Sequence, residues 1–284
     1  MSEMRRPSWL KRPIGKDPEF FALRRMVRAS GLATVCESAS CPNLGECWSR
    51  GFLTVMILGD TCTRACRFCG VAHGTPGPLD REEPIRVAKL LAGLNLRYVV
   101  LTSVDRDDLP DGGSGLWAAT IHAVRTACPE VYVEALISDF GGATPALDRV
   151  IEAWPDVLSH NVETVESLQR TVRPQASYRR SLGVLERAAA RGCVTKSGLM
   201  VGLGETMEEV TQTLRDLAAT GVKMVTVGQY LRPSAACLPV ARYWPPEEFD
   251  EIRKTAVSLG LDAQAGPLVR SSYQADLRVR GSAA

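Results

Sequence analysis

The chain has 284 residues, of which 45% are hydrophobic and 23% are charged, and its formal net charge is +2. These values are ordinary for a soluble globular protein with one large domain or two small ones. The small net charge argues against a general nucleic-acid binder, which carries a strongly basic face. Because no apolar run reaches the length of about 18 residues that a membrane helix needs, we expect no membrane association.

Residues 1–50 carry more basic than acidic side chains, and we predict that they form an N-terminal extension. Within them, residues 18–30 predict a short helix, because proline suits the first helical turn. The basic excess indicates either a solvated face or a landing site for an acidic partner. We expect a core domain over residues 51–245, followed by a C-terminal helix and tail over residues 246–284.

Strands and helices alternate from residue 52 onward. The predicted strands are residues 52–59, 97–104, 131–137, 157–162, 195–201 and 222–230, and the predicted helices are residues 84–94, 116–128, 145–153, 178–191, 207–219 and 246–259. Strict alternation implies a parallel sheet with right-handed crossovers. Six such units predict an α/β fold, a partial (β/α)6 TIM-type barrel whose mouth is closed by the N-terminal and C-terminal extensions. An open doubly wound sheet is the alternative.

Six of the nine cysteines form two triads with regular spacing. The first triad is C-x4-C-x5-C at Cys36, Cys41 and Cys47, and the second is C-x3-C-x2-C at Cys62, Cys66 and Cys69. Structural zinc takes four Cys or His ligands, which neither triad supplies. Three thiolates suit a 4Fe–4S cluster with one open iron. Buried apolar thiols fit poorly among so many polar neighbours, and disulfides fit poorly in a large chain without a signal peptide.

The second triad follows the first predicted strand, and barrel enzymes carry their chemistry on such loops. Other polar residues at predicted strand ends are therefore expected at the same mouth: Ser103 and the loop Val104–Asp111, His160, Asn161, Glu163, Lys196, Ser197, Gln229 and Tyr230. The remaining cysteines, Cys128, Cys193 and Cys237, are interpreted as plain packed or surface thiols.

The C-x3-C-x2-C spacing on this loop resembles the signature of the radical S-adenosylmethionine superfamily. By this resemblance, the cluster on Cys62, Cys66 and Cys69 binds the amino and carboxylate groups of S-adenosylmethionine at its open iron. The reduced cluster then cleaves the cofactor to methionine and a 5′-deoxyadenosyl radical, while the protein positions and shields the reactants.

A narrower resemblance, to the lipoyl synthases, covers nearly the whole chain. It rests on both triads together with the C-terminal run Arg270-Ser271-Ser272-Tyr273. Supporting matches are Pro7-Ser8-Trp9-Leu10, Val104-Asp105-Arg106-Asp107-Asp108-Leu109, His160-Asn161-Val162-Glu163-Thr164, Arg173-Pro174, Met200-Val201-Gly202-Leu203-Gly204-Glu205-Thr206 and Gly228-Gln229-Tyr230-Leu231. The chain departs from the family in the run Ala235-Ala236-Cys237-Leu238-Pro239, which carries Ala and Cys where the family usually shows a basic residue and His. This leaves open the alternative that Cys237, on the loop after the last barrel strand, faces the active-site mouth.

The lipoyl synthase resemblance implies that the first triad holds an auxiliary 4Fe–4S cluster, which donates sulfur. Its fourth ligand is a serine that we match to Ser272, although spacing alone does not separate it from Ser271. A hard alkoxide leaves a soft cluster more easily than a thiolate does, which suits a cluster that is dismantled. Asn161, Glu163 and Arg173 are the candidate contacts to S-adenosylmethionine, with ordinary strand-end hydrogen bonding as their alternative role.

The same resemblance implies a transferase of lipoate biosynthesis and protein lipoylation. It would insert sulfur at C6 and C8 of an octanoyl chain on a lysine of a lipoyl carrier, either E2 subunits or the glycine cleavage H protein. The expected reductant is ferredoxin or flavodoxin, and unpaired cysteines fit the cytoplasm. Two alternatives stay open: another radical enzyme that inserts sulfur, and a non-enzymatic iron–sulfur carrier.

Overall fold

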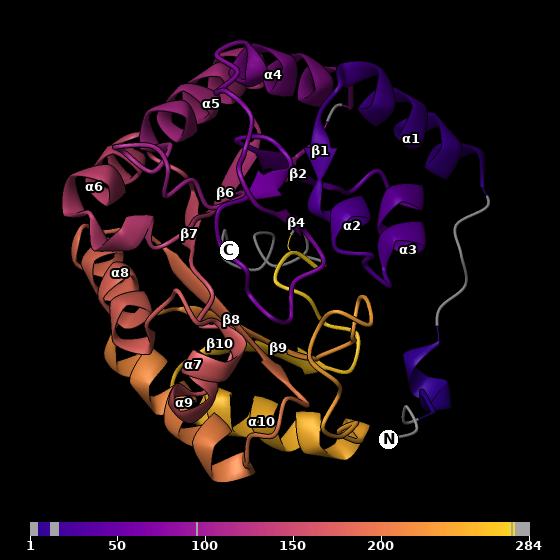
Figure 1. The fold of residues 1–284 in the computed structure, drawn as a ribbon, viewed down its shortest axis with the longest axis vertical. Helices are drawn as coiled ribbons and strands as arrows, with labels where there is room; N and C mark the ends of the chain where they lie inside the picture. Colours follow the sequence, from indigo (N-terminus) through magenta and orange to yellow (C-terminus); the bar gives the residue numbers. More distant parts are fainter. Residues whose placement is uncertain (1–4, 12–16, 95, 274, 276–284) are drawn as a thin grey trace. The chain divides into compact units, whose positions relative to one another are not determined.

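The computed structural model describes residues 5–11, 17–94, 96–273 and 275 (Figure 1). The chain packs as two compact units, each described by itself below. The N-terminal unit comprises Pro13–Arg64, Val71–Leu158 and Ser272–Ala284, and the C-terminal unit comprises Met1–Arg12, Ala65–Gly70 and Ser159–Ser271. This division follows packing and cuts across the segments 1–50, 51–245 and 246–284, so the three-part organisation stays a prediction.

The N-terminal unit is built on parallel strands. Strand β2 pairs with β5, and β5 pairs with β6, while β1 joins β2 in the antiparallel direction. Every residue of β2 is buried, as parallel strands covered on both faces require. The strands are β1 (Ala33–Thr34), β2 (Thr54–Ile57), β3 (Thr61–Cys62), β4 (Ala72–His73), β5 (Tyr98–Ser103), β6 (Tyr132–Leu136) and β7 (Val157–Ser159), of which the last residue, Ser159, is assigned to the C-terminal unit.

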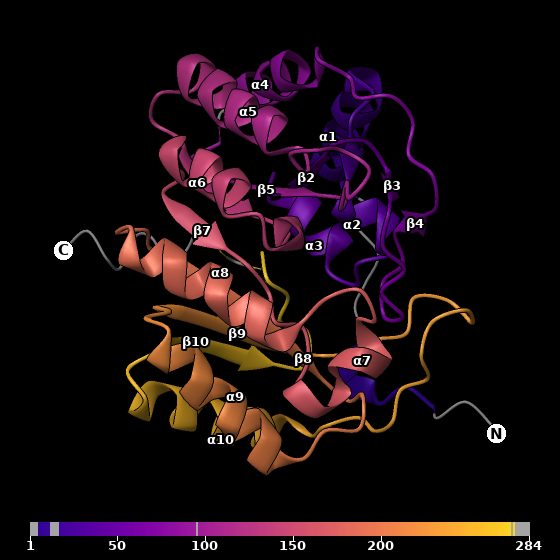
Figure 2. The same cartoon turned by 60° about the vertical axis from the view of Figure 1, so that its left-hand side comes forward.

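Helices cover this sheet, with α4, α5 and α6 packed in succession (Figure 2). The indole of Trp117 on α5 is fully buried and donates a hydrogen bond of 3.2 Å to Ser103 at the end of β5. The helices are α1 (Pro18–Ser30), α2 (Val35–Ser38), α3 (Leu44–Ser49), α4 (Glu83–Leu94), α5 (Ser114–Ala127), α6 (Thr144–Glu152) and the 3-10 turn η2 (Phe140–Gly142).

The C-terminal unit continues the same alternation. Strand β9 lies between β8 and β10 and pairs with both in parallel. Its core joins Leu199 and Val227 of the strands to Leu214 and Phe249 of the helices. The elements are η1 (Ser8–Leu10), η3 (Glu166–Leu168), α7 (Gln169–Val172), α8 (Tyr178–Ala190), β8 (Thr195–Val201), α9 (Met207–Ala219), β9 (Met224–Gln229), α10 (Pro246–Ser258) and β10 (Asp262–Gly266).

The alternation of parallel strands and helices confirms the predicted α/β class. Helices α1 and α9 and strand β8 have the predicted bounds, and each of the six predicted strands is present. Strand β10 was not predicted, because its sequence D-A-Q-A-G lacks the β-branched and aromatic residues that favour strands. It forms by pairing with β9. Among the described residues, no helix is long and apolar enough to cross a membrane.

The backbone of Gly228 on β9 lies very close to the backbone of Val269, and this contact provides a test of the packing in the C-terminal unit. A Cβ atom at Gly228 would lie 2.1 Å from the carbonyl oxygen of Val269. We expect Gly228→Ala to lower the free energy of unfolding by about 2–3 kcal/mol, because backbone must shift to accept the methyl group. Gly183→Ala on α8 is the control, since a Cβ there meets no atom within 4 Å. Urea unfolding of both variants measures the difference, and equal stability would contradict this packing.

Candidate functional site

The segment between β2 and Cys62 is held in place by hydrogen bonds to a buried carboxylate. After β2 the chain turns through Leu58 and Gly59, both in the left-handed region with φ of 68° and 92°. The buried carboxylate of Glu83 accepts hydrogen bonds from the N–H groups of Leu58 at 2.7 Å and Gly59 at 3.2 Å. Strand β3 then ends at Cys62 itself, whose carbonyl accepts from Gly74 at 2.9 Å. These hydrogen bonds hold both ends of the segment that runs from β2 to Cys62.

The sulfur of Cys62 receives two backbone N–H groups. The amides of Arg64 and Asp105 lie 3.4 Å and 3.3 Å from Sγ. The carboxylate of Asp105 lies 3.7 Å from the same atom. Burial raises the pKa of the Cys62 thiol, the charge of Asp105 raises it further, and the two amides oppose both effects. Amide donors stabilise a thiolate, the form in which cysteine binds metal.

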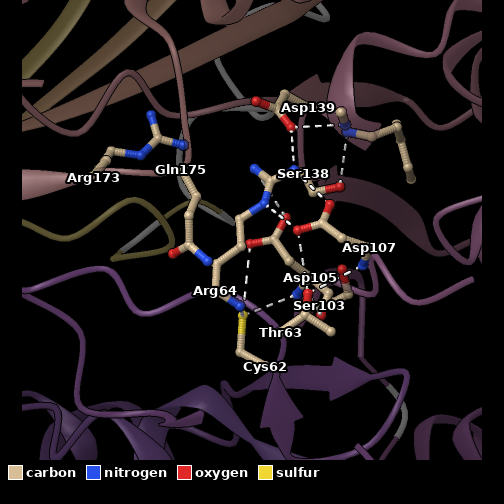
Figure 3. A network of polar contacts seen from close by, with 12 residues as sticks. Cys62, Thr63, Arg64, Ser103, Asp105, Asp107, Ser138, Asp139, Arg173 and Gln175 are labelled. Atoms are coloured by element: carbon tan, nitrogen blue, oxygen red, sulfur yellow. Dashed lines mark hydrogen bonds and ion pairs between the residues drawn. The ribbon is translucent and has the colours of Figure 1, made fainter. Parts of the chain in front are cut away.

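The side chain of Arg64 lies at the centre of three aspartates (Figure 3). Its Nε and Nη2 donate to the two carboxylate oxygens of Asp107 at 2.7 Å and 2.8 Å, and Nη2 also donates to Asp139 at 2.7 Å. Asp105 lies 3.5 Å away, and the guanidinium side chain is only 3% exposed. Because these aspartates follow β5 and β6, Arg64 ties the Cys62 loop to the carboxyl ends of two neighbouring strands.

Cys66 and Cys69 belong to the C-terminal unit and share one turn, in which the Cys69 N–H donates to the Cys66 carbonyl at 3.0 Å. The backbone of this turn is bonded to its own unit: Ala65 N–H to Gln175 Oε1 at 2.8 Å, Arg67 N–H to Val172 O at 2.9 Å, and Leu238 N–H to Arg67 O at 2.8 Å. Since Cys62 lies in the other unit, joint ligation of one cluster by the second triad stays a prediction.

Cys237, where this chain departs from the family pattern, lies beside the same turn. Its Sγ donates to the carbonyl oxygen of Cys69 at 3.4 Å and lies 3.5 Å from Ser234 Oγ. The guanidinium of Arg232 fixes the loop by donating to the Cys237 carbonyl at 2.9 Å. The thiol therefore contacts the backbone of a predicted cluster ligand.

The first triad gathers within the N-terminal unit, on and between α2 and α3. The Cys41 N–H donates to the Cys36 carbonyl at 3.0 Å. Burial, followed by the charge of the neighbouring thiolates, raises the pKa of Cys47 to about 12, and Cys36 and Cys41 both contribute. The three cysteines therefore influence one another's charge within one unit, and their joint ligation of a cluster stays a prediction. Among the described residues, no set of three or more Cys, His, Asp or Glu converges on one ion, but cubane ligands bind separate irons.

The two serines of the C-terminal run have different hydrogen-bond partners. Ser272 Oγ accepts a hydrogen bond of 2.9 Å from Thr54 Oγ1 on β2, and the Thr54 backbone N–H is hydrogen-bonded to Cys36. The next residue, Tyr273, donates to Glu46 on α3 at 2.9 Å. Ser272 is therefore adjacent to the first triad through residues of a single unit. Ser271 has a different partner, Asn161 in the C-terminal unit.

The candidate cofactor contacts Asn161, Glu163 and Arg173 lie together in the C-terminal unit. Asn161 Nδ2 donates to Glu163 Oε1 at 3.0 Å. Glu163 has left-handed backbone with φ of 65°, although its N–H and carbonyl pair with Gly198 and Met200 of β8. Backbone strain of this kind is common at functional sites. Burial raises the pKa of Glu163, and the cation of Arg173 opposes that change.

Arg173 has an unused donor. Its Nη1 donates to the carbonyls of Asn161 and Val162, both at 3.1 Å. Its Nε is buried and makes no hydrogen bond within the described part of the chain. An unpaired buried N–H is costly and calls for a partner. Acceptors on Asn161 and Glu163 beside a free donor on Arg173 suit a ligand with both ammonium and carboxylate groups, as S-adenosylmethionine has.

Two other residues that were predicted at the mouth, His160 and Gln229, make hydrogen bonds within the C-terminal unit. His160 Nε2 lies 2.9 Å from the Ser181 hydroxyl and is buried against α8. Gln229 donates to the carbonyl of Arg242 at 3.1 Å and accepts from the N–H of Trp244 at 2.8 Å, so it secures the segment before α10. Arg64 and Thr54 could not be identified from the sequence. Arg64 is a residue type that is mostly exposed, and Thr54 lies in an apolar strand, so neither position indicates a buried polar contact.

Comparison with known proteins defines the class. The family model described as the Radical SAM superfamily matches residues 56–217. The structure resembles that of Streptococcus suis SuiB bound to S-adenosylmethionine, with a TM-score of 0.60 and 8% identity over 78% of this chain and 54% of that chain. The fold is thus the partial barrel of the radical S-adenosylmethionine enzymes, as predicted. A 4Fe–4S cluster and S-adenosylmethionine are the cofactors of this class.

Two curated relatives narrow the class further. A lipoyl synthase of Chlorobium chlorochromatii is 53% identical over 275 residues, which cover 96% of this chain and 94% of the relative. A lipoyl synthase of Thermus thermophilus is 54% identical over 276 residues, which cover 95% of this chain and 85% of the relative. The chain therefore belongs to the lipoyl synthase family. It is an enzyme of the sulfurtransferase type that acts on a lipoyl carrier protein, and the alternative of a non-enzymatic carrier is wrong.

The aspartate cluster around Arg64 predicts a large stability difference. Arg64→Met removes the cation that contacts Asp107 and Asp139, and loss of one partner from a buried ion pair costs about 3–5 kcal/mol. We expect that loss in the unfolding free energy of the cluster-free protein. The control is Arg179→Met, because Arg179 and its partner Glu166 have side chains 73% and 52% exposed. Such a surface pair contributes below about 1 kcal/mol. Equal effects of the two variants would contradict the buried network.

Proposed function

We propose that the chain inserts sulfur at C6 and C8 of an octanoyl chain on a lysine of a lipoyl carrier, with an auxiliary 4Fe–4S cluster as the consumed sulfur source. Cys36, Cys41 and Cys47 would hold that cluster and Ser272 would be its fourth ligand. The observation that carries the proposal is the Thr54–Ser272 hydrogen bond of 2.9 Å beside the first triad. Because the cluster gives up its sulfide, it is a substrate of the reaction.

The pairing of Ser272 with Thr54 suits a ligand that must leave. The Thr54 hydroxyl donates to Ser272 Oγ, and a donated hydrogen bond lowers the basicity of the serine oxygen. A less basic, hard oxygen holds a soft iron weakly. Tyr273, the residue after Ser272, donates its own hydroxyl to Glu46 at 2.9 Å, so the segment would stay near the triad when Ser272 is released.

Cys62, Cys66 and Cys69 would hold the second cluster. When bound, this cluster and S-adenosylmethionine supply an electron and the radical that removes hydrogen from the octanoyl chain. The chain's own contribution at Cys62 is a thiolate stabilised by the N–H groups of Arg64 and Asp105. The Arg64 ion pairs fix those amides, so the ligand is positioned before the cluster is built.

Asn161, Glu163 and Arg173 would bind S-adenosylmethionine. The Glu163 carboxylate and the Asn161 carbonyl accept hydrogen bonds, which suits an ammonium group or ribose hydroxyls. The free Nε–H of Arg173 suits a carboxylate. Radical chemistry needs such fixed contacts, because the reactive carbon must lie near its target C–H bond and away from water.

The partners follow from the family and from surface charge. The carrier would be an E2 subunit or the glycine cleavage H protein, and the electron donor ferredoxin or flavodoxin. The outer face of α1 exposes Phe21, Arg25 and Arg28 at helical spacing, which supports docking of an acidic domain. The described cysteines are free thiols, in keeping with work in the reducing cytoplasm.

Removal of the first triad tests the sulfur source. The double variant Cys36→Ala, Cys41→Ala should bind about four irons after anaerobic reconstitution, against about eight for the parent chain. It should still form 5′-deoxyadenosine from S-adenosylmethionine, but mass analysis of an octanoylated carrier should find no carbon–sulfur bond.

The matched control for this experiment is Cys128→Ala, Cys193→Ala, which removes the same number of thiols outside both triads. It should keep the full iron content and the lipoylated product. Sulfur insertion by the Cys36, Cys41 variant at the parent level would overturn the donor role of the auxiliary cluster.

A further inference from the structure

Two adjacent serines near the C-terminus have separate partners. Ser272 Oγ accepts from Thr54 in the N-terminal unit at 2.9 Å, whereas Ser271 Oγ accepts from Asn161 Nδ2 in the C-terminal unit at 2.6 Å. Only Ser272 is assigned a role by the proposed function. The contact of Ser271 with a candidate cofactor residue therefore needs its own explanation.

The hydrogen bonds of Asn161 fix the orientation of its amide. Nδ2 carries two N–H groups, of which one is donated to Glu163 Oε1 at 3.0 Å and the other to Ser271 Oγ at 2.6 Å. A carboxylate only accepts hydrogen bonds, so the NH2 group must face Glu163 and the carbonyl oxygen must face away. Both donors are used, and the Asn161 oxygen is presented in one direction as an acceptor.

The space around this amide is narrow. A Cβ atom on Gly198 of β8 would lie 2.8 Å from Asn161 Oδ1 and 3.2 Å from Ser271 Oγ. Because Gly198 has no side chain, there is space for the Asn161 amide and the Ser271 hydroxyl at this position. Without Ser271, one N–H of a residue that is only 8% exposed would lose its acceptor. The terminal amide torsion is broad and roughly two-fold, so the group could then turn.

We propose that Ser271 is a positioning residue for S-adenosylmethionine, which holds the Asn161 amide so that Asn161 and Glu163 present their oxygens to the cofactor. The R-S-S-Y run would then serve both centres, with Ser271 on the cofactor side and Ser272 on the auxiliary triad. This inference rests on the proposed role of Asn161 and Glu163 as cofactor contacts. It adds a residue whose hydroxyl acts through Asn161 and not on the reacting atoms.

The test compares Ser271→Ala with Ser272→Ala in anaerobically reconstituted protein, by equilibrium dialysis of S-adenosylmethionine. We expect Ser271→Ala to weaken binding about tenfold with unchanged iron content, since a buried hydrogen bond of this kind is worth about that factor. KM for S-adenosylmethionine should rise while turnover at saturation is kept. Ser272→Ala should bind the cofactor within about twofold of the parent chain. Parent-level binding by Ser271→Ala would overturn the inference.

A double-mutant cycle separates positioning from general damage. If Ser271 acts through Asn161, Ser271→Ala should weaken binding no further in an Asn161→Ala background. A full additional loss in that background would overturn the inference. If Asn161→Ala itself binds S-adenosylmethionine normally, the proposed cofactor contact of Asn161 fails instead.

Gly198→Ala tests the orientation of the Asn161 amide without removing Ser271, because the added methyl group displaces the Asn161 oxygen. It should weaken binding like Ser271→Ala, and unchanged binding would count against the inference.

Discussion

A buried guanidinium organises the loop that carries Cys62. Arg64 is the second residue after Cys62, and its side chain is enclosed by Asp105, Asp107 and Asp139 from the loops after β5 and β6. A cation that is 3% exposed cannot leave its anions without a large desolvation cost. The backbone N–H groups of Arg64 and Asp105 are thereby aimed at the Cys62 sulfur. The Cys62 side chain is thus oriented by the strand ends of its own unit.

A second constraint acts at the other end of the chain. The C-terminal run divides between two networks, since Ser271 bonds Asn161 and Ser272 bonds Thr54. One short segment therefore contributes to both groups of candidate residues. Hydroxyl groups suit this role because each both donates and accepts. In the proposed function one cluster is consumed and the other is kept, and a segment whose two serines have separate partners would suit that division.

The sequence predicted elements that depend on local pattern and missed those that depend on distant partners. Helix α9 has the predicted bounds because Thr206 and Glu209 form a capping box that is legible in sequence. The two triads are visible in the sequence because cysteine spacing is local information, and their role as cluster ligands stays a prediction. The partner of Ser272 could not be found in this way, because Thr54 lies more than two hundred residues earlier. His160 was expected at the mouth, yet it pairs with Ser181 of α8. Strand ends alone do not decide which way a side chain points.

The central claim is that the first triad holds the sulfur that reaches the product. The most direct measurement is a single-turnover reaction of protein whose clusters were rebuilt with heavy sulfide, in buffer that contains only light sulfide. The account predicts a lipoylated carrier whose mass shows heavy sulfur at both inserted positions. A product that contains only light sulfur would contradict it, because the sulfur would then come from solution and not from the cluster beside Ser272.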